Sequence, residues 1–274
     1  MTNKDRVIDG KAPDAAFGTK EWAATNVNIQ IGCEHGCLYC YGQCMSVRFG
    51  RTTGNTWTTP VINRGKVAEG YRKRRGTIMF PTTHDITQAN LEPCLTVLKK
   101  MLAAGNEVLV VSKPHLVCVN RLCQELEAYK DQILFRFTIG SAAAAVLSFW
   151  EPHAPAYPER LASLREAFQR GYKTSVSCEP MLDGSIQRVI DDARPYVTDA
   201  IWLGRVNNIR GTLVRNAPYN QVARAKADEL LALQTDDWVR EMYETHKHDP
   251  LIKFKDSFKA VVGLDRPTEK GLDI

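Results

Sequence analysis

The chain has 274 residues, enough for one large domain or two small ones, and 44% of them are hydrophobic, which excludes global disorder. Its formal net charge of +5 permits a polyanionic substrate without requiring one. The first residues lack an apolar signal core and no stretch reaches the length of a membrane span, so we expect a cytoplasmic protein with no membrane partner. In a reducing compartment, its eight cysteines are expected to be metal ligands or buried thiols.

Short β-branched segments alternate with amphipathic ones along the chain, which is typical of βα units and a parallel sheet. Strands are predicted at residues 27–31, 77–81, 107–112, 133–139, 173–178 and 200–203. Helices are predicted at 91–104 and 158–170, because a proline stands near each start and a glycine follows each end. Residues 220–248 are predicted to be helical, and residues 251–254 are a candidate short strand.

The pattern predicts an α/β fold in a single domain overall, since no linker or repeat interrupts it. We expect an N-terminal arm over residues 1–26, a core over 27–219 and a helical C-terminal extension over 220–274, packed on the core.

The most informative motif is a cysteine loop. Cys33, Cys37 and Cys40 follow the first predicted strand with the spacing C-x3-C-x2-C. Three thiolates on one tight loop can hold three irons of a 4Fe–4S cube, which normally takes four cysteines. The fourth iron then has the open coordination position that catalytic metal sites require.

Two other metal sites are compatible with this loop. Zinc would need a fourth ligand, and Cys44 or His35 could supply it, although zinc loops usually pair two couples far apart in sequence. A closed electron-transfer cluster could use Cys44, but such motifs usually carry a proline where Met45 stands.

The spacing, with Tyr39 directly before the last cysteine, resembles the signature of the radical SAM superfamily. The resemblance implies a partial (β/α)6 barrel and a 4Fe–4S cluster whose open iron binds S-adenosylmethionine (SAM) through its amino and carboxylate groups. It further implies reductive cleavage of SAM into methionine and a 5′-deoxyadenosyl radical that abstracts hydrogen from a substrate, which the sequence does not identify. An external flavodoxin-like or ferredoxin-like electron donor is implied as a partner. The rival interpretation is a non-catalytic iron–sulfur or zinc protein that binds nucleic acid.

Further segments resemble the spore photoproduct lyase-like branch of this superfamily. They are residues 151–155, 159–167, 171–174, 178–182 and 254–257, in the family's order. That branch carries a hydrogen-donating cysteine near the end of its second strand, where this chain has Thr82 and Thr83. Repair of thymine photodimers is therefore not expected. Cys178, at the end of the fifth strand, is a candidate hydrogen donor, and its alternative role is that of a buried structural thiol.

Parallel sheets place ligand-binding groups at the carboxyl ends of their strands. At such positions, and beside the cluster, the resemblance implies these cofactor-binding residues: Tyr39, Thr82, Thr83, Asp85, Lys113, Thr138, Ser141, Glu179, Arg205, Asn207 and Asn208.

Individual roles follow from the same resemblance. Thr82, Thr83 and Asp85 are expected near the methionine ammonium, and Lys113 near the ribose or the methionine carboxylate. Ser141, or Thr138 in its place, is expected near the ribose hydroxyls, and Glu179 and the residues after the sixth strand near adenosine or substrate. Helix capping is the alternative for Asp85 and Ser141, and a solvated strand exit for Lys113.

A basic segment, Arg72, Lys73, Arg74 and Arg75, precedes the second predicted strand. Such a cluster can bind phosphate backbones through charge alone, so nucleic acid is a candidate partner. The alternative is a solvated surface.

Overall fold

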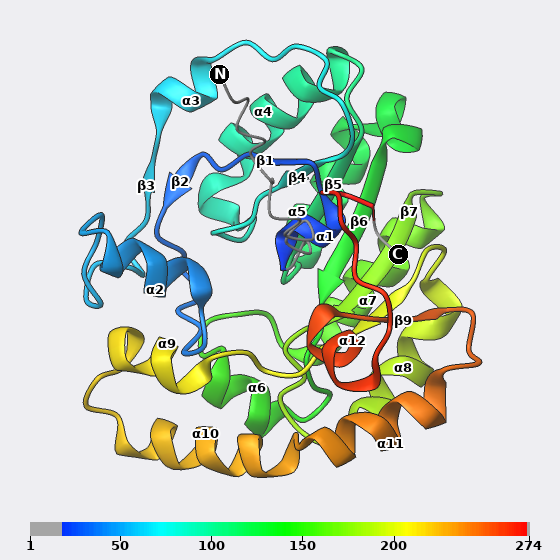
Figure 1. Cartoon of the computed structure of the whole chain (residues 1–274). Coiled ribbons are helices and arrows are strands. Elements are labelled where there is room, and N and C mark those ends of the chain that lie inside the picture. Colours follow the sequence, from blue (N-terminus) through cyan, green and yellow to red (C-terminus); the bar gives the residue numbers. More distant parts are fainter. Residues whose placement is uncertain (1–17, 273–274) are drawn as a thin grey trace, which may run out of the picture.

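A parallel β-sheet runs through the middle of the structure (Figure 1), a computed structural model that describes residues 18–272. Its seven strands lie in the order β1-β4-β5-β6-β7-β8-β9, and each neighbouring pair is parallel. They are β1 (Thr25–Asn26), β4 (Ile78–Phe80), β5 (Val108–Ser112), β6 (Ile133–Thr138), β7 (Lys173–Cys178), β8 (Ile201–Leu203) and β9 (Ile252–Phe254). This order is that of a partial barrel, so the predicted fold class is confirmed, and β9 confirms the candidate short strand at residues 251–254, here as a seventh strand of the sheet.

The strand predicted at residues 27–31 is wrong in its position. The barrel strand β1 ends at Asn26, and β2 (Gln30–Ile31) instead pairs antiparallel with β3 (Val61–Ile62). Pro81 has no N–H for the ladder beyond β4. There the side chain of Asn28 replaces strand pairing, since its Oδ1 accepts from the backbone N–H groups of Thr82 and Thr83 at 2.7 and 3.0 Å.

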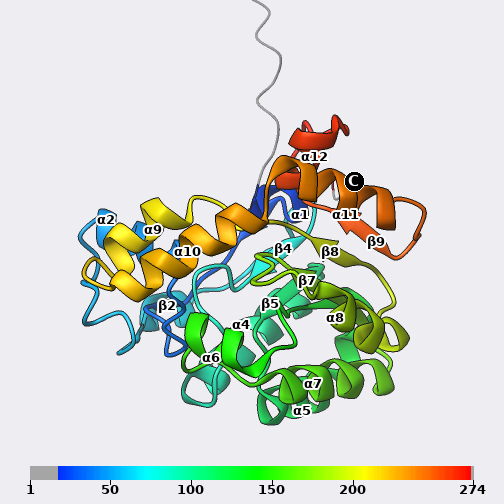
Figure 2. The same ribbon diagram turned by 90° about the horizontal axis from the view of Figure 1, so that it is seen from below.

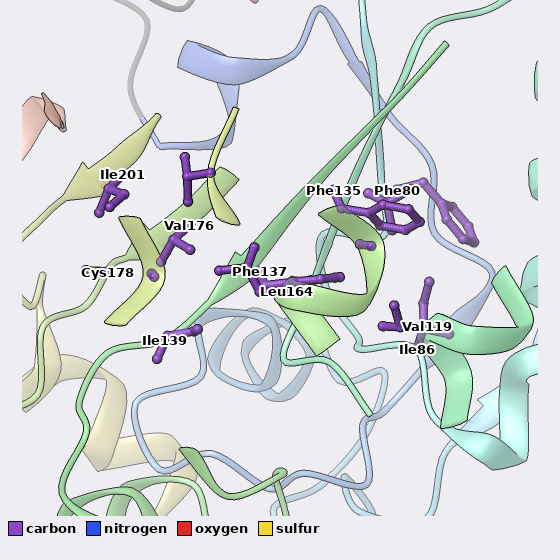
Figure 3. Packing of buried hydrophobic residues seen from close by; sticks show 14 of the residues in the cluster. Phe80, Ile86, Val119, Phe135, Phe137, Ile139, Leu164, Val176, Cys178 and Ile201 are labelled. Atoms are coloured by element: carbon purple, nitrogen blue, oxygen red, sulfur yellow. The ribbon is translucent and has the colours of Figure 1, made fainter. Parts of the chain in front are cut away.

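Four helices cover the outer face of the sheet, on one side of it in Figure 2. They are α4 (Leu91–Ala103), α5 (Leu116–Glu125), α7 (Tyr157–Gln169) and α8 (Ile186–Ala193). Helices α4 and α7 confirm the predictions to within one residue, and each is followed by a glycine at φ 78°, Gly105 or Gly171. Figure 3 shows Phe135 and Phe137 of β6 in this layer with Leu164 of α7. Each such buried side chain contributes about 1.5–3 kcal/mol to stability.

The inner face of the sheet is closed by the short helix α1 (Thr19–Trp22), on the opposite side from α5 and α7 in Figure 2. Its Trp22 packs edge-on against Trp202 of β8, with ring centroids 5.6 Å apart. The buried guanidinium of Arg136 lies 4.6 Å from the Trp22 ring and 5.2 Å from the Trp202 ring. Aromatic rings stabilise a buried cation in this arrangement, so these side chains make a dense barrel floor.

The remaining helices lie around the barrel mouth and along the C-terminal part. They are α2 (Tyr41–Arg48), α3 (Arg64–Ala68), α6 (Ala144–Trp150), α9 (Ile209–Asn216), α10 (Gln221–Leu233), α11 (Asp236–His246) and α12 (Asp256–Val262), with short 3-10 turns η1 (Gln88–Asn90), η2 (Glu127–Gln132) and η3 (Arg194–Tyr196).

The predicted helical segment 220–248 is two helices, because the Thr235 side chain accepts from the N–H of Trp238 and starts α11 anew. The C-terminal extension also supplies β9 to the sheet. Among residues 18–272, no helix is long and apolar enough to cross a membrane.

Candidate functional site

A cavity opens at the carboxyl ends of β4 to β7, and we call it the barrel cavity. Thr82, Thr83, Lys113, Thr138 and Glu179 reach it from four successive strand ends. Its other lining residues include the cluster cysteines Cys33, Cys37 and Cys40 with Tyr39, and apolar floor residues Trp22, Met79 and Val111. The predicted metal ligands and most predicted cofactor-binding residues are therefore brought together in one place.

The cysteine loop lies between β2 and α2 and is held by backbone contacts. Gly32 has φ 95°, and a Cβ there would lie 2.6 Å from the carbonyl oxygen of Trp57. The N–H of Cys33 donates to that same oxygen at 2.9 Å. Cys40 caps α2, where its Sγ accepts from the N–H of Gln43 at 3.4 Å. These contacts fix the loop before any metal binds.

The three cysteines are not spaced for a single zinc ion that all of them would bind. Burial raises the pKa of the Cys33 thiol to about 12, and it also raises the pKa values of Cys37 and Cys40, so a metal centre must displace their protons. A zinc ion with Zn–S bonds of 2.3 Å would need sulfurs about 3.8 Å apart. Among the described residues, the group of candidate ligands whose atoms all lie within 4.8 Å of one another, and which could hold a metal ion, is Cys33, His35 and Asp85, without the other two cysteines.

The sequence offers Cys44 as a possible fourth metal ligand. It is not among the residues lining the barrel cavity, and its Sγ lies 4.0 Å from Nη1 of Arg215 on α9. Its position therefore favours the three-cysteine arrangement.

Asp85 is the centre of a buried hydrogen-bond network beside the loop. Its Oδ1 accepts from the backbone N–H of Lys113 at 2.7 Å and from the hydroxyl of Ser112 at 3.0 Å. Its Oδ2 lies 2.8 Å from Nδ1 of His35 and 3.7 Å from Nζ of Lys113. Burial acts to raise the pKa of Asp85, but Lys113 and His35 outweigh it and hold that pKa well below its ordinary value. Asp85 is therefore ionised, and it holds His35, Ser112 and Lys113 in place.

His35 connects this network to the surface. The sequence does not indicate this structural role. Its Nε2 lies 2.9 Å from Nε2 of His115, and Nδ1 of His115 is 3.7 Å from a carboxylate oxygen of Glu159. Both nitrogens of His35 therefore have partners within the chain. The only sequence signal was its place between Cys33 and Cys37.

A second buried network fixes Tyr39. Its hydroxyl donates to Glu151, whose other carboxylate oxygen accepts from Arg160. Arg160 also donates to the carbonyl oxygen of Thr138 at 3.2 Å. Lys113 Nζ lies 5.8 Å from the Tyr39 ring. Burial opposes its charge, yet Asp85 and other acidic neighbours raise the pKa of Lys113, so its ammonium stays charged.

The opposite wall of the barrel cavity carries Glu179. Burial raises its pKa from 4.5 to about 7, although Lys255 acts to lower it. Lys255 Nζ lies 3.6 Å from Glu179 and 2.9 Å from the buried Glu21. This lysine, which the sequence did not single out, also sits 3.9 Å from the Trp22 ring. It ties the barrel floor to the end of β9.

Several predicted site residues do not line the barrel cavity. Ser141 donates to Asp183 and accepts from the N–H of Ala143 at 2.9 Å, which is a local capping role. The remaining ones, which follow β8, are Arg205, Asn207 and Asn208. Arg205 donates to Asp236 at 2.7 Å, and both asparagines are exposed.

Cys178 lies on the outer face of the sheet, away from the barrel cavity. It is fully buried in the hydrophobic core, where Figure 3 shows it near Val176. Burial raises the pKa of its thiol. Side chains alternate across a strand, so Ser177 reaches the cavity and Cys178 does not. The expected role of hydrogen donor does not agree with this placement, and that of a structural thiol does.

The basic segment lies at the amino end of the sheet. Asn106, just before β5, accepts from the N–H of Arg74 at 2.7 Å and donates to the carbonyl of Arg72 at 3.2 Å. Lys73 donates to the carbonyl of Gly105. The barrel cavity opens at the carboxyl ends of the strands, so this segment lies at the other end of the sheet from the cysteine loop.

Comparison with known proteins places this geometry in a fold class. No family model matches the chain. It is 29% identical over 172 residues to an uncharacterized protein of Acidianus two-tailed virus, a match that covers 58% of this chain and 56% of the viral protein. The chain thus spans just over half the length of that relative. It is 21% identical over 204 residues to an uncharacterized protein of Methanocaldococcus jannaschii, covering 72% of this chain and 76% of the archaeal one.

Solved structures with the same fold include spore photoproduct lyase. A variant of that enzyme superposes with a TM-score of 0.57 at 16% identity, covering 88% of this chain and 78% of the enzyme. Its complex with a dinucleoside spore photoproduct gives 0.56 at 15% identity, covering 90% and 78%. SuiB of Streptococcus suis, bound to S-adenosylmethionine, gives 0.52 at 10% identity, covering 90% and 54%. These are radical SAM enzymes, so the chain has the partial-barrel fold of the radical SAM superfamily.

Proposed function

We propose that this chain is a radical SAM enzyme in which Cys33, Cys37 and Cys40 hold a 4Fe–4S cluster and SAM completes its coordination. The observation that carries the proposal is the convergence of these cysteines with Lys113 and Glu179 on one cavity at the carboxyl ends of the sheet. When bound, the cluster and SAM supply reductive cleavage to methionine and a 5′-deoxyadenosyl radical, which abstracts hydrogen from substrate.

Lys113 is the residue suited to the methionine carboxylate of SAM. It lines the barrel cavity, is largely buried and keeps its charge, and an ammonium in a water-poor site binds a carboxylate strongly. Asp85 holds Lys113, Ser112 and His35 through both of its carboxylate oxygens. We therefore assign Asp85 a positioning role, and Thr82 and Thr83 the polar contacts with the methionine end of SAM.

The opposite wall is suited to adenosine and substrate. Thr138 and Glu179 supply hydrogen-bonding groups there, above the apolar side chains of Trp22, Met79 and Val111. An apolar floor excludes water, which protects a reactive radical from being quenched before it meets the target bond.

The reaction proposed here is not photodimer repair. Among the residues that line the barrel cavity, the thiols are those of the three cluster cysteines, and Thr82 and Thr83 stand where the photoproduct lyases place their cysteine. Cys178 faces the outer core. No thiol is thus left in the cavity to return hydrogen to a repaired product.

The test is anaerobic reconstitution with iron and sulfide, followed by reduction in the presence of SAM. We expect methionine and 5′-deoxyadenosine in equal amounts, formed slowly without substrate, and no loss of photodimers from irradiated DNA. The matched control is Cys37→Ala, which should form neither product. If an intact, reducible cluster forms neither product in the unaltered protein, the proposal is wrong, and a non-catalytic iron–sulfur protein takes its place.

The electron must come from an external donor, for which we propose a flavodoxin-like or ferredoxin-like protein. Cys40 is the least buried of the cluster cysteines, and the next residue, Tyr41, is exposed at the mouth of the cavity. We therefore propose that the donor docks beside the start of α2.

A further inference from the structure

Cys33 lies close to two potential metal ligands that are not among the three cysteines. Its Sγ is 3.9 Å from Oδ2 of Asp85, and the same oxygen is 2.8 Å from Nδ1 of His35. Among the described residues, this sulfur, nitrogen and oxygen all lie within 4.8 Å of one another. We call Cys33, His35 and Asp85 the mixed trio, because it gathers three kinds of donor atom in one small volume.

The separations within the mixed trio are close to those around a tetrahedral zinc ion. Bonds of about 2.3 Å to sulfur and about 2.0 Å to nitrogen and oxygen place sulfur and oxygen about 3.5 Å apart, and nitrogen and oxygen about 3.3 Å apart. The separations in this chain, 3.9 and 2.8 Å, differ from those values by about 0.5 Å or less. Small side-chain shifts therefore suffice for an ion to replace the proton between His35 and Asp85.

His35 is already oriented as a metal ligand. Its Nε2 lies 2.9 Å from Nε2 of His115, whose Nδ1 is 3.7 Å from a carboxylate oxygen of Glu159. When His35 carries its proton on Nε2, that N–H donates to His115 and the Nδ1 lone pair faces Asp85. A metal-ligating histidine almost always donates its other ring N–H to a neighbouring acceptor, which fixes the tautomer.

Asp85 is oriented in the same way. Its Oδ1 accepts from the backbone N–H of Lys113 at 2.7 Å and from the hydroxyl of Ser112 at 3.0 Å, so Oδ2 is the oxygen turned to Cys33 and His35. Lys113 Nζ lies 3.7 Å from Oδ2, and its charge is expected to weaken the binding of a cation. Cys33 and Asp85 line the barrel cavity, through which an ion and a water ligand can enter.

We propose that the cluster-free protein binds a single divalent transition-metal ion through Cys33 Sγ, His35 Nδ1 and Asp85 Oδ2, with the Cys33 thiol proton released to solvent. Thiolate, imidazole and carboxylate together suit zinc or ferrous iron, whereas magnesium and calcium take oxygen ligands. The single ion and the 4Fe–4S cluster exclude each other because both use Cys33, a consequence that rests on the proposed function. Zinc in the mixed trio thus keeps the protein from taking up a cluster.

Cobalt is the probe, because cobalt bound to a thiolate absorbs in the near ultraviolet by charge transfer from sulfur to metal. The full chain, reduced and freed of iron with a chelator, is titrated anaerobically with Co²⁺ in the absence of sulfide. We expect one equivalent to bind with this absorption. Zn²⁺ should displace it, because zinc binds such ligands more tightly than cobalt does, and Mg²⁺ should not.

Variants identify the ligands. His35→Ala and Asp85→Asn should each weaken Co²⁺ binding at least about tenfold, since loss of even an outer-shell partner typically costs about ten- to a hundredfold. Cys37→Ala is the matched control and should bind Co²⁺ like the wild type, because it removes a cysteine of the same loop that is outside the mixed trio. Lys113→Ala should tighten the binding about threefold or more, a gain that damage to the fold does not produce.

Competition with the cluster is measured separately. Protein loaded with one equivalent of Zn²⁺ should take up iron and sulfide at least about tenfold more slowly than metal-free protein, and removal of the zinc by a chelator should restore the uptake. The cobalt titration needs neither sulfide nor SAM, so its outcome is independent of whether deoxyadenosine forms.

Three results would overturn the proposal. The first is Co²⁺ bound no more tightly than Mg²⁺, and the second is Co²⁺ bound without the charge-transfer absorption. The third is a loss of Co²⁺ binding in Cys37→Ala as large as that in His35→Ala, because the three cysteines would then hold the ion. Equal rates of cluster uptake with and without zinc would overturn the mutual exclusion.

Discussion

The two walls of the barrel cavity differ in how completely their polar groups are partnered within the chain. On the cysteine wall, Asp85 is contacted by His35, Ser112 and Lys113, and Tyr39 is held by Glu151. On the opposite wall, the ion pair of Glu179 among the described residues is with Lys255 at 3.6 Å. A pre-organised wall suits a cofactor that is always the same, and a less constrained wall suits a substrate.

The largest expected effect is on the cysteine wall. Replacing Cys33, Cys37 or Cys40 by alanine should abolish iron retention and deoxyadenosine formation, because a cube cannot be held stably by two thiolates. Cys44→Ala is the matched control and should retain nearly all of its iron. Iron and sulfide analysis of anaerobic preparations measures both. Emptying of the site by Cys44→Ala would identify a closed four-cysteine cluster instead.

Lys113→Ala should weaken SAM binding about ten- to a hundredfold, because it removes one charge-assisted hydrogen bond in a buried site. The cluster should stay, since the lysine is not a ligand. Equilibrium binding of SAM to the reconstituted variant provides the measurement, with exposed Lys99→Ala as control. Unchanged SAM affinity would mean that Lys113 serves only to neutralise Asp85.

Glu179→Gln should alter the pH dependence of stability. Because burial raises the folded-state pKa of Glu179 from 4.5 to about 7, the folded protein binds more protons than the unfolded one in that window. The free energy of unfolding therefore falls as pH rises from 4.5 to 7. The variant should lack about 3 kcal/mol of this fall, so that relative to the wild type it gains stability at pH 8 and not at pH 4.

Urea unfolding of both proteins at the two pH values gives the difference, in which contributions common to both cancel. Exposed Glu241→Gln on α11 is the control and should show the wild-type dependence. An identical pH dependence in Glu179→Gln and the wild type would show that Glu179 is solvated and ionised like a surface carboxylate.

The smallest effect is expected outside both walls. Cys178→Ala should leave the rate of deoxyadenosine formation unchanged and lower the free energy of unfolding by about 1–2 kcal/mol, because it removes a buried core side chain. Product assays and urea unfolding measure the two quantities separately. A large loss of activity with unchanged stability would restore the hydrogen-donor interpretation.

The parts of the candidate site that the sequence predicted are the local ones, and the parts that it did not predict depend on the path of the chain after a strand. Strand ends are local features, and Lys113, Thr138 and Glu179, which the family resemblance singles out at predicted strand ends, do line the barrel cavity. The three cysteines were found by their spacing. For residues that follow a strand end by two or more positions the loop direction decides, so Thr82 and Thr83 reach the cavity but other predicted residues do not. Ser141 turns toward Asp183, and Arg205 toward Asp236.

The networks that support the site could not be predicted, because their members are far apart in sequence. Tyr39 and Glu151 are 112 residues apart, and His35 and His115 are 80 apart. The position of β1 depended on Asn28 reaching across to Thr82, a side-chain contact that periodicity does not contain. The composition of residues 27–31 is typical of a strand, but the barrel strand β1 ends before them at Asn26, and only Gln30 and Ile31 belong to a strand, β2.

The measurement that tests the central claim most directly is electron paramagnetic resonance of the reduced, reconstituted protein with SAM labelled by ¹⁷O in its carboxylate. We expect a spectrum that changes on adding SAM and shows hyperfine coupling to the label, because the iron without a cysteine ligand would bind that carboxylate. A spectrum unaffected by SAM, in a protein shown to hold a complete cluster, would contradict the account, since every iron would then be closed to the cofactor.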